Sequence, residues 1–221
     1  MSCYTTPDGT FELGPLRRGE CAVLASGRGG RAKAIVDAGT TDLVLTLRPE
    51  ARVEGVVRPP ADHPGALASI MRSTKLEDRS SGSESIASHA GAFGANVDAG
   101  ANVFFATDSA GHVSQPLVLD LAPGERRTGV ELQLERAARL RVRYRGEFVR
   151  ARCGVNRDGF EIENEDVDPS SKNTSIFVPA GELTVELRRW TGDRLDPDEL
   201  PRQTQTVRVA AGETTTLVFK D

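Results

Sequence analysis

Hydrophobic and polar residues alternate along most of the chain in short runs that are typical of half-buried β-strands. In residues 130–134, 140–144 and 183–187 every second residue is apolar. Turn-forming residues separate such runs at intervals of roughly 8–12 residues, the spacing expected of an antiparallel β-sandwich. No stretch keeps a 3.6-residue apolar period, so the pattern predicts an all-β protein.

The same pattern repeats. Gly19, Gly100 and Gly181 are spaced 81 residues apart, and each follows a short strand and opens a new alternating one. A second set of turn glycines, Gly39, Gly124 and Gly212, stands later in each copy, before another predicted strand. Recurrence of this kind indicates tandem copies of one supersecondary unit.

A third landmark sets the boundaries of the copies. Residues 51–57 (Ala-Arg-Val-Glu-Gly-Val-Val) match residues 138–144 (Ala-Arg-Leu-Arg-Val-Arg-Tyr). We therefore expect β-sandwich modules over residues 50–135 and 136–221, with the C-terminal half of another over residues 1–48. A half module buries little core, so we expect the chain to be an excerpt or a mis-started reading of a longer protein. Residues 73–90, which are rich in Ser and include several charged residues, lack periodicity and predict a loop.

At these turns and strands the chain resembles the carboxypeptidase regulatory-like family. The matching positions of the first copy are Asp8, Gly9, Phe11, Leu16, Gly19 and Ala25, while Cys21 replaces the usual aromatic residue. The resemblance implies tandem antiparallel β-sandwich modules of the prealbumin-like (transthyretin-like) or immunoglobulin-like kind.

The family's role is accessory and non-catalytic. By resemblance we expect structural or interaction modules of a larger surface or secreted bacterial protein, located outside the cell or in its envelope. No signal peptide is visible. The implied partners are a polysaccharide or another surface protein, and the chain is expected to be monomeric as a segment. The alternative is a carbohydrate-binding module accessory to a hydrolase or peptidase.

Charge and hydrophobicity narrow the classes of partner. The net charge is −4, which argues against a general nucleic-acid binder. No apolar run approaches the roughly 18–20 residues that a membrane helix needs. Neither nucleic acid nor a membrane is therefore an expected partner.

No catalytic residue, cofactor site or metal site is predicted. His63, His89 and His112 stand among Pro, Gly and Ser residues without a paired-histidine motif, which favours surface loops. Cys3, Cys21 and Cys153 lack the close Cys spacing of a zinc site, although a Cys3–Cys21 disulfide is an open alternative. No nucleophile-elbow motif is present, so an enzyme is not expected.

Two motifs have both a chemical and a structural interpretation. Residues 27–32 fit a degenerate dinucleotide-binding pattern, but no helix follows them, so a hairpin loop is the better interpretation. The acidic segment 158–168 offers oxygen ligands that could hold Ca²⁺. A solvated strand and loop is favoured for it.

Arg139, Arg141, Arg143 and Arg145 alternate with apolar residues, so all four should lie on one sheet face. They could hold an anionic glycan or an acidic partner. The favoured alternative is cross-strand pairing with acidic strands, either Glu131 and Glu135 or Glu182 and Glu186.

Trp190 is the only tryptophan and follows the predicted strand at 183–187. Exposed aromatic rings can stack on sugars, and Arg189 and Asp193 lie beside it in the sequence. These three residues form the predicted ligand-binding site, with a core position at the sandwich end as the alternative for Trp190.

Overall fold

The computed structural model contains β-strands and turns in the part of the chain that it describes, and this confirms the predicted all-β class. It describes residues 2–16, 18–63, 68–74, 83–86, 88–89, 91–148, 150–190 and 202–220, with side chains at all of these except 74, 83–84, 88–89 and 190. No helix within these ranges is long and apolar enough to cross a membrane. The chain divides into two compact units, Met1–Glu50 and Ala51–Asp221.

The first unit is built on one antiparallel hairpin. Its strands are β1 (Glu20–Gly27) and β2 (Gly30–Asp37), joined by a two-residue turn in which Gly27 pairs with Gly30. Gly30 has a φ of +115°, and an added Cβ would lie 1.7 Å from the Arg48 carbonyl oxygen. The apparent dinucleotide motif is therefore a hairpin loop, as predicted, and only glycine fits its last turn position. Val23 is the one buried hydrophobic residue described in this unit.

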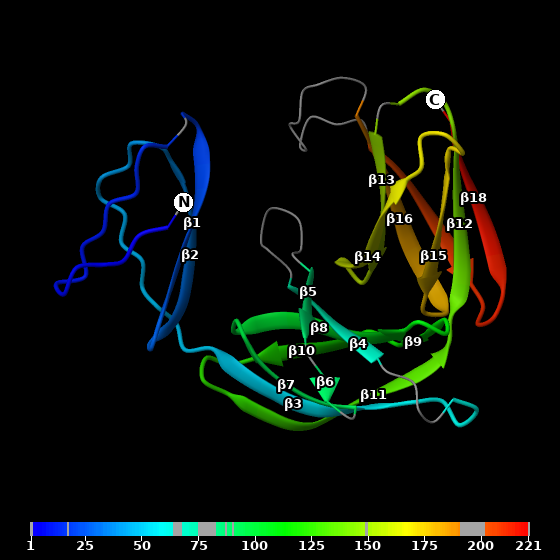
Figure 1. Ribbon diagram of the computed structural model, residues 1–221, viewed down its shortest axis with the longest axis horizontal. Helices are drawn as coiled ribbons and strands as arrows, with labels where there is room; N and C mark the ends of the chain where they lie inside the picture. Colours follow the sequence, from blue (N-terminus) through cyan, green and yellow to red (C-terminus); the bar gives the residue numbers. More distant parts are fainter. Residues whose placement is uncertain are drawn as a thin grey trace. The chain divides into compact units, whose positions relative to one another are not determined.

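The second unit begins with nine strands that form a single sheet folded into two layers (Figure 1). They are β3 (Ala51–Arg58), β4 (Ala68–Thr74), β5 (Ser83–Ile86), β6 (Ser88–His89), β7 (Ala92–Val97), β8 (Gly100–Asp108), β9 (His112–Ser114), β10 (Leu117–Leu121) and β11 (Arg126–Arg136). One layer centres on β7–β3–β11 and the other on β5–β4–β8–β10, while β9 pairs with both β8 and β11.

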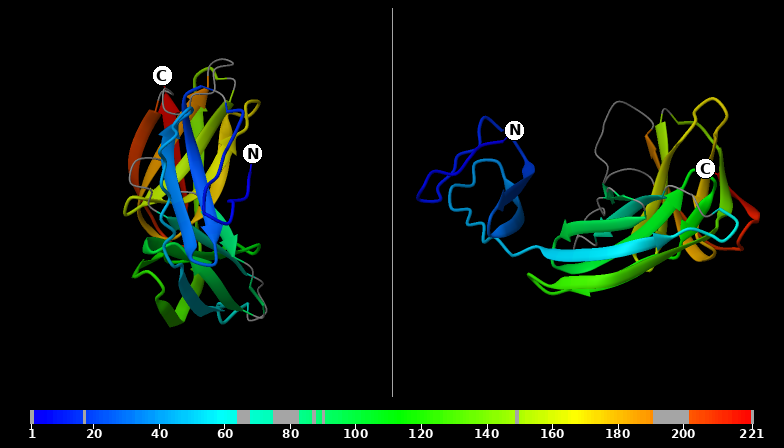
Figure 2. Two further views of the ribbon diagram at one scale, coloured as in Figure 1. Left: turned by 90° about the vertical axis from the view of Figure 1, so that its left-hand side faces the viewer. Right: turned by 60° about the horizontal axis from the view of Figure 1, so that its bottom comes forward.

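Seven further strands form a second sandwich from two separate sheets, which face each other in Figures 1 and 2. They are β12 (Ala138–Arg145), β13 (Arg150–Arg157), β14 (Phe160–Val167), β15 (Asn173–Val178), β16 (Gly181–Trp190), β17 (Arg202–Val209) and β18 (Thr214–Lys220). Their orders are β15–β12–β18 and β14–β13–β16–β17.

The two sandwiches have equivalent strand orders. In each, the opening strand has one antiparallel neighbour and one parallel neighbour, β7 and β11 for β3, and β15 and β18 for β12. The parallel pairs were not anticipated from the alternating pattern, which is the same for either strand direction. The module boundaries at 50–135 and 136–221 remain a prediction.

The repeated glycines adopt the same backbone conformation. Gly19, Gly100 and Gly181 have φ values of +113°, +106° and +133°. Gly19 immediately precedes β1, and the other two are the first residues of β8 and β16. Other residues avoid this region because Cβ clashes with the backbone, so a glycine must recur wherever the turn recurs.

Two buried clusters form the cores of the second unit. The first lies between the layers of the nine-stranded sheet, and the second, which includes Leu140, Val142 and Val185, lies between the other two sheets. β8 contributes to both, because Phe104 belongs to the first cluster while Val103 and Phe105 belong to the second. A strand covered on both faces needs apolar residues at consecutive positions.

The expected loop at 73–90 is wrong in part, since β4 extends to Thr74 and β5 and β6 occupy 83–86 and 88–89. The remaining residues of that segment lie outside the described ranges. The Cys3–Cys21 disulfide does not form, because all three cysteines are free. Burial raises the pKa of the Cys153 thiol to about 12, so this residue acts as an inert core side chain.

Candidate interaction surface

The outward face of the sheet β15–β12–β18 is strongly basic. Along β12 the residues between the arginines are fully or nearly fully buried, so Arg139, Arg141, Arg143 and Arg145 all lie on the opposite side, as predicted. The parallel register with β18 places Lys220 beside Arg145. We call this surface the arginine face; its outward positions are Arg139, Arg141, Arg143, Arg145, Asn173, Ser175, Phe177, Thr214, Thr216, Val218 and Lys220.

The expected ion pairs of these arginines are wrong. β12 lies between β15 and β18, whereas Glu131 and Glu135 belong to β11, and Glu182 and Glu186 belong to β16 in the opposing sheet. The outward neighbours of the arginines are hydroxyl, amide and apolar side chains and, beside Arg145, the cation Lys220. Within the described residues, none of the five cations of the arginine face forms an ion pair with a carboxylate.

One end of the arginine face is held in place by side-chain contacts. Arg139 Nε donates a hydrogen bond to Ser175 Oγ at 2.7 Å. Its guanidinium carbon lies 5.9 Å from the centre of the Phe177 ring, which is 51% exposed. This end thus combines a fixed cation with an accessible aromatic ring.

The edge strand β18 of this face is held through hydrogen bonds to its backbone. Gln205 Nε2 donates to the Val218 carbonyl oxygen at 3.1 Å, and Gln203 Nε2 donates to that of Lys220 at 2.6 Å. Both glutamines belong to β17, so they satisfy carbonyl groups on the edge strand β18 from the other sheet. These two hydrogen bonds therefore tie the edge strand β18 to β17 of the opposing sheet.

The predicted site around Trp190 is described in part. Trp190 ends β16 and its backbone pairs with Arg150, but its side chain and Asp193 lie outside the described residues. Arg189 is half-buried, donates a hydrogen bond to the Tyr144 hydroxyl and has its guanidinium carbon 5.0 Å from the centre of that ring. These contacts give Arg189 a structural role, and the glycan site remains a prediction.

The acidic segment forms strand β14 and the turn after it, in agreement with the favoured interpretation. Asp166 pairs with Arg150 at 3.1 Å. Hydrogen bonds from Ser171 and Ser170 lower the pKa of Asp168 to about 2. Burial, together with nearby glutamates, raises the pKa of Glu163. Calcium binding by this segment remains a prediction.

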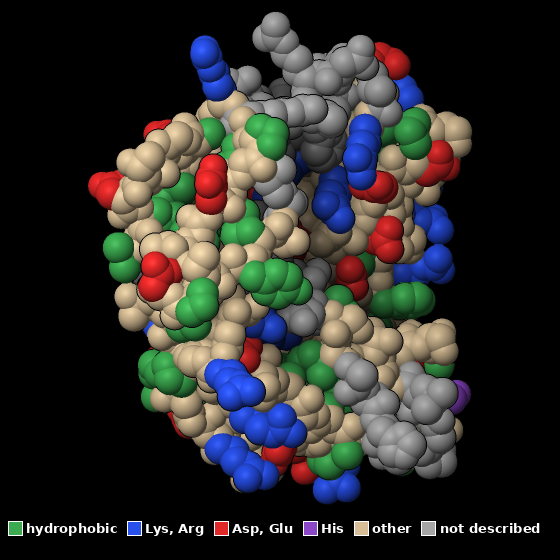
Figure 3. Space-filling model, turned by 60° about the vertical axis from the view of Figure 1, so that its left-hand side comes forward, with side chains coloured by type: hydrophobic (Ala, Val, Ile, Leu, Met, Phe, Trp, Pro, Cys, Tyr) green, Lys and Arg blue, Asp and Glu red, His purple; other side chains and the backbone are tan. Residues whose placement is uncertain are grey.

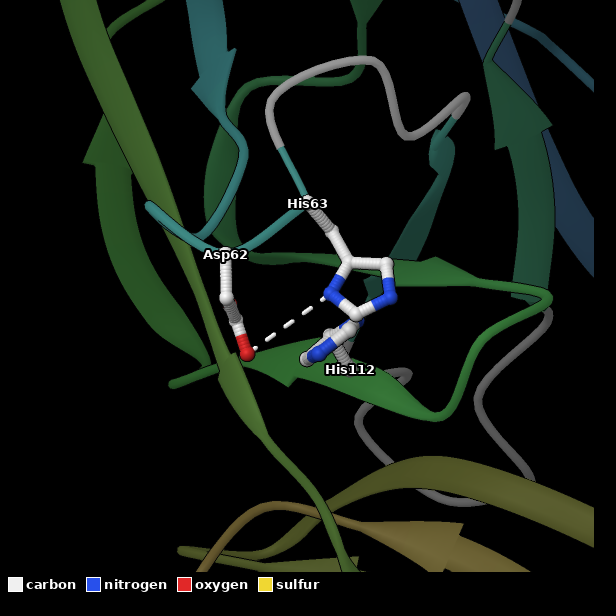
Figure 4. Close-up of side chains that lie close together, drawn as sticks. All are labelled: Asp62, His63 and His112. Carbon is white, nitrogen blue, oxygen red and sulfur yellow. Dashed lines mark ion pairs between the residues drawn. The ribbon is translucent and has the colours of Figure 1, made fainter.

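The structure brings together two histidines from distant parts of the sequence. His63 follows the turn after β3, and His112 opens β9 with only 7% of its surface exposed, so the prediction of a surface loop is wrong for His112. The two ring centres are 5.1 Å apart, and the Asp62 carboxylate lies 3.6 Å from His63 Nδ1 (Figure 4). Among the described residues, this is the one group of three potential metal ligands. His112 is too far from Asp62 and His63 in the sequence for any spacing motif to reveal the group.

Comparisons with known proteins find solved structures that are only distantly similar to this chain. No family model matches the chain, and no curated protein matches it. A solved structure of the Bacillus anthracis TIE protein aligns with 92% of this chain at 12% identity and a TM-score of 0.33, and this chain spans only 41% of it. The minor pilin GBS52 of Streptococcus agalactiae aligns with 77% of this chain and 94% of its own length, at 9% identity and a TM-score of 0.30.

A streptococcal ancillary pilin aligns with 93% of this chain and 76% of its own length, at 11% identity and a TM-score of 0.29. Similarities of this size carry no argument about what the chain binds. The β-sandwich class rests on the strands and sheets described above, and the carboxypeptidase regulatory-like family remains a prediction.

Proposed function

We propose that the chain is a non-catalytic interaction module of a larger surface or secreted bacterial protein, and that its arginine face binds an acidic polysaccharide. The observation that carries the proposal is the set of five cations on that face without a carboxylate partner among the described residues. Four arginines in a row are unfavourable unless an anion neutralises them, because like charges repel across such short distances. The location outside the cell or in its envelope rests on the family resemblance.

The geometry of the face suits an extended polymer. Alternate residues on a strand are about 6.6 Å apart, so the four arginines of β12 form a straight row of positive charge. Guanidinium groups hold carboxylate or sulfate groups through paired hydrogen bonds. The neighbouring Ser175, Thr214 and Thr216 offer hydrogen-bonding groups for sugar hydroxyls, and Phe177 offers a ring for stacking. Together they favour an acidic polysaccharide over an acidic peptide.

Calorimetric titration with dextran sulfate, with neutral dextran as the uncharged probe, tests the proposal. Dextran sulfate should bind and neutral dextran should not, and salt should weaken the binding by screening. The double variant Arg141→Ser/Arg143→Ser should bind at least about tenfold more weakly, since two charge-assisted contacts are lost.

The matched control is Arg58→Ser/Arg126→Ser, which removes the same charge from two arginines that are already paired with Glu131 and Glu54. It should bind dextran sulfate like the parent chain. Equal weakening in both double variants would mean that only net charge matters and would overturn the assignment to the arginine face. Tighter binding of poly-glutamate than of dextran sulfate would replace the polysaccharide with an acidic polypeptide.

A further inference from the structure

The cluster of Asp62, His63 and His112 rests on a buried carboxylate. Asp108, at the end of β8, has only 1% of its side chain exposed and accepts a hydrogen bond from His112 Nδ1 at 2.8 Å. It also accepts hydrogen bonds from the backbone N–H groups of Ala110 and His112, at 2.9 and 2.8 Å.

The hydrogen bond to Asp108 determines which nitrogen of His112 can bind a ligand. It occupies Nδ1, which donates to the buried Asp108 carboxylate. Nε2 is then the ring nitrogen left with a lone pair whenever the imidazole is neutral. A carboxylate that orients the far nitrogen of a histidine in this way is the usual outer support of a histidine metal ligand.

The second half of the cluster comes from a closed turn. The His63 backbone N–H donates to the Pro60 carbonyl oxygen at 3.0 Å, and this fixes the turn that presents Asp62 and His63 next to His112. Figure 4 shows the two imidazole rings and the Asp62 carboxylate gathered beside β9. Their side chains differ in freedom, since those of Asp62 and His63 are 75% and 54% exposed while that of His112 is 8% exposed.

We propose that Asp62, His63 and His112 bind zinc or a similar divalent transition-metal ion. One ligand atom from each residue lies within 4.8 Å of the others. Ligands at about 2.0–2.1 Å from a tetrahedral zinc ion stand roughly 3.4 Å apart, so the site must contract on binding. Rotation of the exposed Asp62 and His63 side chains toward the fixed His112 supplies that movement.

The ligand chemistry selects the class of ion. Two imidazoles and one carboxylate favour zinc, nickel or copper, whereas calcium prefers six or more oxygen ligands. Three protein ligands leave one tetrahedral position for water or for a group from outside the chain. The bound ion would join the turn after β3 to the start of β9.

Calorimetric titration of the chelator-treated full chain with zinc chloride tests this proposal. The Cys3→Ser/Cys21→Ser background removes the two cysteines that are not buried. We expect one zinc ion per chain and no heat of binding with calcium chloride. His63→Ala and His112→Ala should each weaken binding at least about tenfold, and Asp108→Asn should weaken it about ten- to a hundredfold although no ligand is lost.

His63→Ala is the decisive variant, because its exposed side chain can be removed with the core intact, as circular dichroism of the metal-free protein will verify. His89→Ala, which removes the remaining histidine, is the control and should bind zinc like the parent. Cobalt in place of zinc should show the visible absorption of a four-coordinate ion, and His63→Ala should lose it. Zinc binding that is absent in the parent, or unchanged in His63→Ala, would overturn the proposal.

Discussion

The sheets β7–β3–β11 and β15–β12–β18 have the same strand order but opposite surface character. On β3 the outward positions are Arg52, Glu54, Val56 and Arg58, and on β12 the equivalent positions are all arginine. Glu54 accepts hydrogen bonds from Arg52 at 2.7 Å and from Arg126 at 2.9 Å. Acidic and basic side chains accordingly lie beside one another at the lower end of the view in Figure 3, the end at which Figure 1 places this sheet.

The difference shows which positions the fold constrains. Inward residues of β3 and β12 are apolar in both sheets, because both must cover a core. The outward residues face solvent and are not constrained by the core. The layer β7–β3–β11 can therefore carry charges of both signs, while β15–β12–β18 carries only cations. Since the balanced face forms an equivalent sheet, the strand arrangement does not require an uninterrupted row of arginines. The proposed binding of an anion is a reason for the row of arginines that the strand arrangement does not supply.

The largest expected effect is on stability, at an inward position where β3 has a glycine and β12 has a valine. Gly55 of β3 stands where β12 has Val142, and an added Cβ at Gly55 would lie 2.2 Å from the Val130 carbonyl oxygen. The register of β11 shifts between Arg127 and Val130, which brings that carbonyl close. Gly55→Val should therefore cost about 3 kcal/mol of unfolding free energy, measured by urea denaturation.

Gly94→Ala on the neighbouring strand β7 is the matched control. An added Cβ there would meet the flexible end of the Arg52 side chain at 3.2 Å, which can move away. Its cost should be clearly smaller than that of Gly55→Val. Similar losses in the two variants would show that strand flexibility, and not the close Val130 carbonyl, explains the glycine at position 55.

The sequence predicted local features well and long-range neighbours poorly. Alternation places the arginines of β12 on one face because side chains alternate over adjacent residues, and recurring glycines mark turns for an equally local reason. Which strand lies beside β12 depends on pairing across the chain, so the expected partners Glu131 and Glu182 were wrong. The approach of His63 to His112 was missed for the same reason, because only the fold brings the turn after β3 next to the start of β9.

An intermediate effect is expected when one sheet is given the charge pattern of the other. Arg141→Glu places a carboxylate between Arg139 and Arg143, as Glu54 stands beside Arg52 in β3. Stability should stay equal or rise by about 0.5 kcal/mol, because repulsion is replaced by attraction. Dextran sulfate binding should fall at least about tenfold. A loss of stability above about 1 kcal/mol would show that the fold itself depends on Arg141.

The smallest expected effect is a change with pH in how much the charged residues of each face contribute to the free energy of unfolding. Hydrogen bonds from Arg52, and then from Arg126, lower the pKa of Glu54 below its ordinary 4.5. The folded state therefore favours ionised Glu54, so its stabilising contribution is present above pH 4.5 and is lost as the pH falls through the lowered pKa of the folded state. Glu54→Gln should be slightly less stable than the parent at pH 7, and the difference should shrink as the pH falls below 4.5 and through the lowered pKa of the folded state.

Arg141→Ser supplies the contrast, because the outward positions of β12, β15 and β18 carry no carboxylate that titrates in this range. Arginine keeps its charge throughout. The difference in unfolding free energy between Arg141→Ser and the parent should thus stay constant from pH 7 to about pH 3, while that of Glu54→Gln declines. Parallel pH profiles for the two variants would mean that the charges of both faces are coupled to the same carboxylates. The arginine face would then already be neutralised within the chain, and its proposed role in binding an external anion would lose its main support.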